Sequence, residues 1–87
     1  MRNLLWQSDA WIEYESLQSE KTTLKRINKL LKDLMRNGYR CSYGKVEMLK
    51  GDLSGFASVR VDQKHRIIFQ ANEREIIVIQ CGGHYND

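Results

Sequence analysis

Apolar residues repeat at helical spacing in the first half of the chain and at strand spacing in the second half. The clearest repeat covers residues 24–35, where apolar residues recur three and four positions apart and charged residues fill the positions between them. The pair Asn37-Gly38 follows, which is typical of a helix C-terminus. A shorter repeat over residues 10–17 predicts another helix, with Ser8 as its N-cap. The pattern therefore predicts two helices, and the second is the more regular.

Strand-like patterns occupy the rest of the chain, at residues 46–50, 56–61, 66–71 and 75–81. Short polar turns, Asp62-Gln63-Lys64 and Asn72-Glu73-Arg74, join the last three, with lengths that favour antiparallel hairpins. Residues 76–79 are apolar on both faces and predict a central strand, while Leu4-Leu5-Trp6 predicts a first strand ahead of the helices. We therefore expect an α+β fold, with two N-terminal helices packed on one face of a small antiparallel β-sheet.

Length and composition limit the classes of protein to consider. The 87 residues allow a single domain, 1–87, and 41% hydrophobic with 29% charged residues is typical of a globular protein. No apolar run reaches the roughly 18 residues of a membrane span, and the N-terminus lacks a signal-peptide pattern, so a cytoplasmic protein with no membrane partner is expected. Two cysteines and two histidines lack ligand spacing, so we expect no metal and no other cofactor.

The excess positive charge lies in one segment. Between Arg40 and Arg66 there are six Lys or Arg and three Asp or Glu, which accounts for the whole net charge of +3. This location predicts a polyanionic partner. The second helix carries a further row of cations, Lys25, Arg26, Lys29, Lys32 and Arg36. This row could bind nucleic acid, or it could be only the solvated face of the helix.

The basic segment also contains residues suited to RNA cleavage. If the apolar residues of its two strands face the core, Glu47 and Arg60 project together from the opposite face. Cleavage of RNA without a metal requires a base for the 2′-OH, cations for the phosphorane, an acid for the 5′ oxygen and support for splayed bases. The candidates are Glu47 as base, Arg66 with Lys50 and Arg60 as cations, His84 as acid and Tyr85 as aromatic platform. Judged by residue type alone, Glu47 could equally form a surface ion pair, and the two terminal residues could be a frayed end.

Several motifs occur in a definite order along the chain. They are KRINKLLKD at 25–33, GKxExLKxxLSGFxSxR at 44–60, HRIIF at 65–69 and HY at 84–85. Together they resemble the YoeB/Txe family of the RelE-like bacterial toxin–antitoxin superfamily. The resemblance implies a RelE-like microbial ribonuclease architecture. It also implies a toxin that acts as a ribosome-dependent mRNA endoribonuclease and stops translation.

The resemblance also assigns roles to individual residues. It implies that Glu47 is the general base, Arg66 the phosphate-stabilising residue and His84 the general acid, with Tyr85 as the family's terminal tyrosine. Basic positions near the scissile phosphate fall on Lys50 and Arg60. His65 matches as the residue before the arginine, although a role in a turn or in packing is an equal alternative.

The implied partners are a YefM-like antitoxin whose C-terminal segment covers the cleft, the ribosome with its mRNA, and a second copy of the chain in a homodimer. Operator DNA would be contacted only through the antitoxin complex. The chain departs from the family's usual residues at Val46, Met48, Ala57, Val59, Gly82-Gly83 and Asn86-Asp87. The rival hypothesis is a non-catalytic ribosome- or nucleic-acid-binding module within a repressor complex. A carboxylate among the cations favours the nuclease, because a protein that only binds RNA has no need of one.

Overall fold

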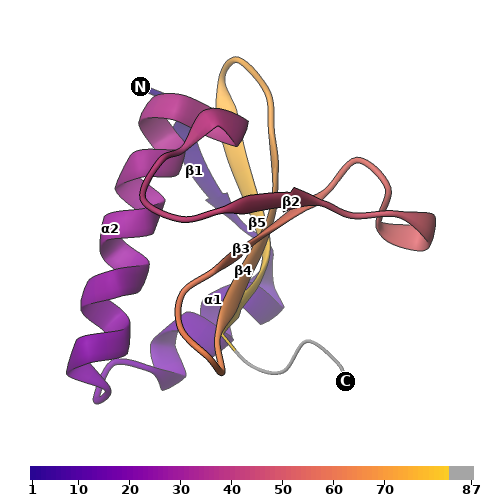
Figure 1. Ribbon diagram of the computed structural model, residues 1–87. Helices are drawn as coiled ribbons and strands as arrows, with labels where there is room; N and C mark the ends of the chain where they lie inside the picture. Colours follow the sequence, from indigo (N-terminus) through magenta and orange to yellow (C-terminus); the bar gives the residue numbers. More distant parts are fainter. Residues whose placement is uncertain (83–87) are drawn as a thin grey trace.

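The computed structural model describes residues 1–82 (Figure 1). The elements in chain order are β1 (Asn3–Trp6), α1 (Ser8–Ser16), α2 (Lys21–Asn37), the 3₁₀ turn η1 (Gly38–Arg40), β2 (Val46–Met48), the 3₁₀ turn η2 (Gly51–Leu53), β3 (Ala57–Arg60), β4 (Arg66–Ala71) and β5 (Glu75–Gly82). The predicted α+β class is confirmed, with both helices and every predicted strand present. None of the helices in this part of the chain is long and apolar enough to cross a membrane.

The strands form one five-stranded sheet in the order β1-β5-β4-β3-β2. The pairs β2–β3, β3–β4 and β4–β5 are antiparallel, as predicted, but β1 pairs with β5 in parallel, so the sheet is mixed. Short turns set the relative directions of β2 to β5, whereas both helices separate β1 from them. The sequence pattern therefore contained no signal for the direction of β1. The strand predicted to be central, β5, is an interior strand, and β4 holds the middle position.

Both helices pack on the same face of the sheet and share one core with it. From α2 the core takes Ile27, Leu30, Leu31 and Leu34, from α1 Ala10, and from the strands Ala57, Val59, Ile67, Phe69, Ile76, Val78 and Cys81. Each large aliphatic or aromatic side chain buried in this way contributes about 1.5–3 kcal/mol to stability. Within residues 1–82 no helix lies on the opposite face of the sheet, which carries polar groups together with the buried Ile68.

Arg2 links the helical layer to the sheet. Its Nε donates to the carbonyl of Asn72 at 2.6 Å, and its Nη1 donates to the carbonyl of Arg36 at 3.2 Å. A cation at the last carbonyls of a helix is favourable both as a hydrogen-bond donor and as a partner for the helix dipole. This contact ties the C-terminal end of α2 to the turn between β4 and β5.

Candidate active site

The strand register brings four polar residues to the helix-free face of the sheet. Glu47 in β2 lies opposite Ser58 in β3, and Arg60 in β3 lies opposite Arg66 in β4. Residues that face one another in an antiparallel pair project from the same side, and residues two apart in one strand do so as well. Because Val59 is fully buried against the helices, these four side chains point the other way.

A cavity of ≈ 310 Å³ opens on this face and is lined by Lys45, Glu47, Arg60 and Arg66. The Nη1 atom of Arg66 lies 3.7 Å from Oε1 of Glu47 and donates to Oγ of Ser58 at 3.2 Å. The Glu47 side chain is 60% exposed and that of Arg66 only 23%. The guanidinium is thus held against the sheet, while the carboxylate stays open to a ligand.

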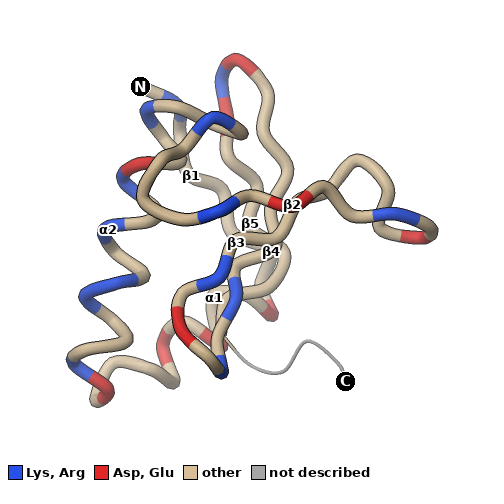
Figure 2. The backbone as a smooth tube through the Cα atoms, in the orientation of Figure 1, with Lys and Arg blue, Asp and Glu red and all other residues tan. Residues whose placement is uncertain are grey.

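The charges of this cavity suit a phosphodiester. Among residues 1–82, three cations and one carboxylate line the cavity, a balance of +2, and Figure 2 shows basic segments at the start of β2 and at the adjoining ends of β3 and β4. An exposed ion pair such as Glu47–Arg66 contributes at most about 1 kcal/mol to stability. The arrangement therefore suits catalysis better than it stabilises the fold. Its cations can bind a phosphate, and the carboxylate beside them can accept a proton.

The loop before β2 is fixed so that Lys45 and Glu47 reach the cavity. The Oδ2 atom of Asp33 on α2 accepts hydrogen bonds from the backbone N–H groups of Ser42 at 2.9 Å and Tyr43 at 2.7 Å. Burial by itself would raise the pKa of Asp33, but hydrogen bonds from Asn37, Tyr43 and Ser42 hold that pKa below its ordinary value. The carboxylate that anchors the loop therefore stays charged well into the acid range.

Gly44 completes the approach of the loop to the core. A Cβ atom at this position would lie 2.7 Å from Cγ2 of Val59 and 3.0 Å from Cδ2 of Leu30. Both neighbours are buried side chains with little room to move. The glycine that begins the motif at 44–60 thus allows the backbone to pass close to the core just before the site residues.

Lys50 and His65 lie apart from the cavity. Lys50 is exposed and precedes η2, because β2 ends at Met48, two residues earlier than predicted, and Gly51 adopts a φ of 69° to begin the turn. His65 belongs to the turn between β3 and β4, where its Nδ1 lies 2.8 Å from Oδ1 of Asp62. The proposed acid and platform, His84 and Tyr85, lie outside the described residues.

Lys45 and Ser58 were not predicted as site residues, although both contribute to the cavity or its support. The alternation of side chains between the two faces of a strand was the signal that could have identified them. Lys45 is two residues before Glu47, and Ser58 is two residues before Arg60. Ser58 is almost fully buried and yet polar, and its contact with Arg66 accounts for it.

The two cysteines are not candidates for chemistry in this fold. Both thiols are free and buried, and burial raises the pKa of Cys41. Burial, together with the nearby charge of Glu13, raises the pKa of Cys81 to about 12. A thiol with a raised pKa is a poor nucleophile at neutral pH. Within residues 1–82 no group of three or more His, Cys, Asp or Glu side chains could hold a metal ion.

The fold and the cavity define a class of small α+β proteins that present a carboxylate and arginines on the open face of a sheet. A chain of the YoeB-YefM complex from Staphylococcus aureus has a similar structure, with a TM-score of 0.86 and 34% sequence identity, covering 98% of this chain and 99% of that chain. A family model for the YoeB-like toxin of bacterial type II toxin-antitoxin systems matches residues 6–85. The chain is 35% identical over 83 residues to the YoeB toxins of Streptomyces coelicolor and of Escherichia coli K12, covering 94% of this chain and 98% of each of theirs. The chain therefore belongs to the YoeB-like toxins and is the toxin of a type II toxin–antitoxin system.

Proposed function

We propose that this toxin is a ribosome-dependent endoribonuclease that cleaves mRNA by metal-independent acid–base chemistry. The observation that carries the proposal is the convergence of Glu47 and Arg66, from β2 and β4, on one cationic cavity. A binding surface for RNA would benefit from the cations, but a carboxylate 3.7 Å from the guanidinium would weaken it. A base beside a phosphate site is what cleavage through the 2′-OH requires.

In the proposed mechanism, Glu47 removes the proton from the 2′-OH of the nucleotide before the cut. The 2′ oxygen attacks the adjacent phosphorus, the bond from phosphorus to the 5′ oxygen breaks, and the products are a 2′,3′-cyclic phosphate and a 5′-hydroxyl. Arg66, fixed by Ser58, and Arg60 stabilise the charge of the phosphorane. His84 supplies the proton to the leaving 5′ oxygen, and Tyr85 stacks on a base; both assignments rest on the resemblance to the family.

Two further RNA contacts are proposed outside the cavity. Lys50 is exposed just before η2, where it can contact phosphate, whereas His65 is held by Asp62. Lys50→Ala should therefore weaken RNA binding more than His65→Ala does, and the reverse order of binding losses would contradict this ranking.

The test uses a bacterial translation extract programmed with a reporter mRNA, in which new 5′ ends are mapped after the toxin is added. The native chain should produce new ends in translated message and none in the same RNA without ribosomes. Glu47→Gln should lower the cleavage rate by about 10²–10⁴-fold, because it removes the base but keeps the shape. Glu73→Gln is the matched control, since it neutralises an exposed carboxylate in the turn between β4 and β5. Cleavage by Glu47→Gln at the native rate would show that Glu47 is not the base.

We further propose that a YefM-like antitoxin neutralises the toxin by covering this cavity with an acidic segment. The structure from S. aureus is of a YoeB-YefM complex, and the balance of +2 in the cavity favours an acidic occupant. Raising the salt concentration should then slow association more than it changes dissociation, as measured by stopped-flow mixing. An association rate independent of salt would argue against electrostatic capture.

A homodimer is the remaining proposed assembly. A YoeB dimer has been described from S. aureus, and Leu5, Trp11 and Ile12 are exposed apolar side chains near the first helix here. Sedimentation of the purified toxin should give the mass of two chains, and a single chain at every concentration would contradict the proposal.

We propose that the toxin contacts operator DNA only through its complex with the antitoxin. Operator DNA should therefore be retarded in gels only when antitoxin is present, and retardation by the toxin alone would contradict this proposal.

A further inference from the structure

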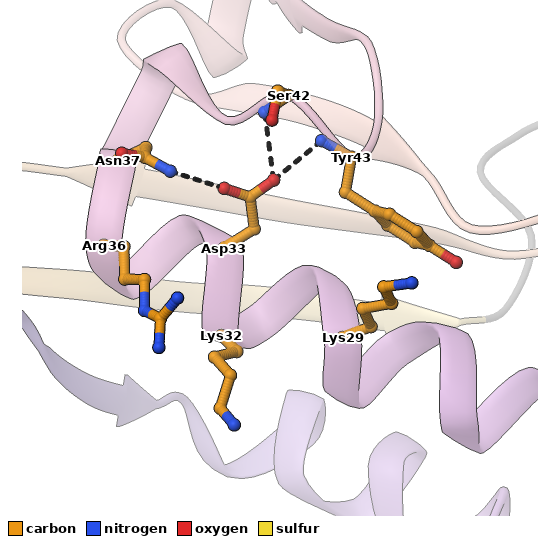
Figure 3. Close-up of a pocket in the computed structure, with 7 residues that line it drawn as sticks. All are labelled: Lys29, Lys32, Asp33, Arg36, Asn37, Ser42 and Tyr43. Carbon is orange, nitrogen blue, oxygen red and sulfur yellow. Dashed lines mark hydrogen bonds between the residues drawn. The ribbon is translucent and has the colours of Figure 1, made fainter.

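A second basic hollow lies between α2 and the loop before β2, which we name the α2 groove (Figure 3). It has a volume of ≈ 520 Å³. Its lining residues are Lys29, Lys32, Asp33, Arg36, Asn37, Ser42 and Tyr43. None of them lines the cavity that contains Glu47.

Three cations of the α2 groove occupy one side of the helix. Lys29, Lys32 and Arg36 are spaced three and four residues apart, which places them in a row along α2. Within residues 1–82 none of the three has a carboxylate oxygen within 4.0 Å of its side-chain nitrogens. Their charge is therefore not consumed by ion pairs and is available to an anionic ligand.

The single carboxylate of the groove is already engaged. Oδ1 of Asp33 accepts from Nδ2 of Asn37 at 2.6 Å, and Oδ2 accepts from the N–H groups of Ser42 and Tyr43. Figure 3 shows Asp33 directed at the loop, while Lys32 and Arg36 extend away from it. Asp33 thus fixes the wall of the groove, and three cations against one carboxylate leave a balance of +2.

An aromatic ring accompanies these cations. The side chain of Tyr43 is 44% exposed, and Nζ of Lys29 lies 4.6 Å from the centre of its ring. Exposed aromatic rings beside cations are the usual platform for bases of single-stranded nucleic acid, which stack on the ring while the cations follow the phosphates. An acidic peptide would use the cations, but its acidic side chains would gain nothing from the ring.

The α2 groove and the Glu47 cavity share one stretch of backbone. Ser42 and Tyr43 line the groove, and Lys45 and Glu47 line the cavity. Two residues of extended chain span at most about 7 Å, so the Cα atoms of Tyr43 and Lys45 are no farther apart than that. Since β2 is the edge strand of the sheet, the cavity and the groove are neighbours around that edge, and an RNA strand would reach the groove by passing Lys45.

We propose that the α2 groove binds single-stranded RNA flanking the cut, with a base stacked on Tyr43 and the phosphates at Lys32 and Arg36. The inference rests on the proposed function, since it extends the path of the same RNA strand beyond the cavity. It gives three members of the row of cations on α2, Lys29, Lys32 and Arg36, a role other than that of a solvated face.

The test measures RNA binding by fluorescence anisotropy in Glu47→Gln protein, which prevents cleavage during the measurement. The probes are a labelled single-stranded oligonucleotide of roughly 10 nucleotides and a labelled dinucleotide that fills only the cavity. Tyr43→Ala should weaken binding of the longer probe roughly 5- to 100-fold and leave dinucleotide binding unchanged. Lys32→Ala should also weaken binding of the longer probe. The slope of log affinity against log salt concentration should fall by about the amount of one phosphate contact.

Controls keep the test specific to the groove. Arg74→Ala removes an exposed arginine from the turn between β4 and β5 and should leave binding of both probes at the parent level. The Tyr43 variant keeps the loop anchored, because Asp33 bonds to the backbone of residue 43 and not to its side chain. Circular dichroism checks that each variant is folded.

Native-like binding of the longer probe by Tyr43→Ala and Lys32→Ala would overturn the inference, as would an equal loss for both probes. The inference would also be overturned if Tyr43→Ala and Lys32→Ala bound an acidic peptide more weakly but bound RNA at the parent level. The groove would then be assigned to a protein partner. Failure of the proposed function gives a different result. In that case the native chain would cut no message in the translation extract, whatever the anisotropy of the Tyr43 variant shows.

Discussion

Ser58 lies almost fully buried beneath Arg66, and its hydroxyl accepts a hydrogen bond from the guanidinium at 3.2 Å. This contact holds a side chain that would otherwise sample many rotamers on an exposed sheet face. Within residues 1–82 the carboxylate of Glu47 has only the 3.7 Å contact with Arg66, so the position of its strand places it. At the scale of single residues, the site thus depends on small neighbours as well as on its charged groups.

Gly44 provides the sharpest residue-level prediction. In Gly44→Ala the added Cβ would lie 2.7 Å from Cγ2 of Val59, so the loop must shift away from the core. Overpacking of this kind costs about 1–3 kcal/mol, and urea unfolding should show a loss of that size. Ser42→Ala, on the exposed part of the same loop, should change stability by less than about 0.5 kcal/mol. Equal stability of Gly44→Ala and the native chain would mean that the loop does not lie close to the core.

At the scale of elements, the turn between β3 and β4 is organised by one carboxylate. Oδ1 of Asp62 accepts from the N–H groups of Lys64 at 2.8 Å and His65 at 2.9 Å, while Oδ2 accepts from Thr23 of α2 at 3.2 Å. Burial by itself would raise the pKa of Asp62, but the hydrogen bonds from His65 and Lys64 outweigh it and lower the pKa below 3.8. The turn and the helix are therefore joined through an ionised side chain.

The lowered pKa of Asp62 fixes the sign of a pH effect. Because its folded pKa lies below the unfolded value of 3.8, the stabilisation is fully present above pH 3.8 and is lost as pH falls through the folded pKa. Urea unfolding of the native chain should therefore show a larger loss of stability between about pH 4 and about pH 2 than that of Asp62→Asn. Identical losses in the two proteins would show that Asp62 has no role in acid sensitivity.

At the scale of the whole molecule, local sequence patterns predicted much of the fold. The helical repeat at 24–35 became α2, and the alternation around Glu47 and Arg60 placed both on the helix-free face. The parallel direction of β1 was not accessible, because no turn links β1 to β5. The start of α1 differs slightly as well: Gln7 takes the cap position, and the helix begins at Ser8.

The candidate site was harder to predict, because its residues lie near the ends of strands. The pattern of apolar and polar residues did not define where those strands end. Lys50 was predicted to lie within β2, but the strand ends at Met48 and the 3₁₀ turn η2 begins at Gly51. His65 is adjacent to Arg66 in sequence, yet the turn directs its ring to Asp62. The α2 groove depends on contact between α2 and a loop ten residues farther along, which no short-range pattern reports.

The central claim is that the toxin cuts RNA through the 2′-OH of the nucleotide before the scissile phosphate. It is tested most directly with a ribosome-bound message that carries a single 2′-deoxynucleotide at a mapped cleavage position. The native chain should leave this message uncut there, whereas the all-ribose message should yield an upstream fragment ending in a 2′,3′-cyclic phosphate. Cleavage of the deoxy-substituted message at the same position and rate would contradict the account, because Glu47 would then have no 2′-OH proton to remove.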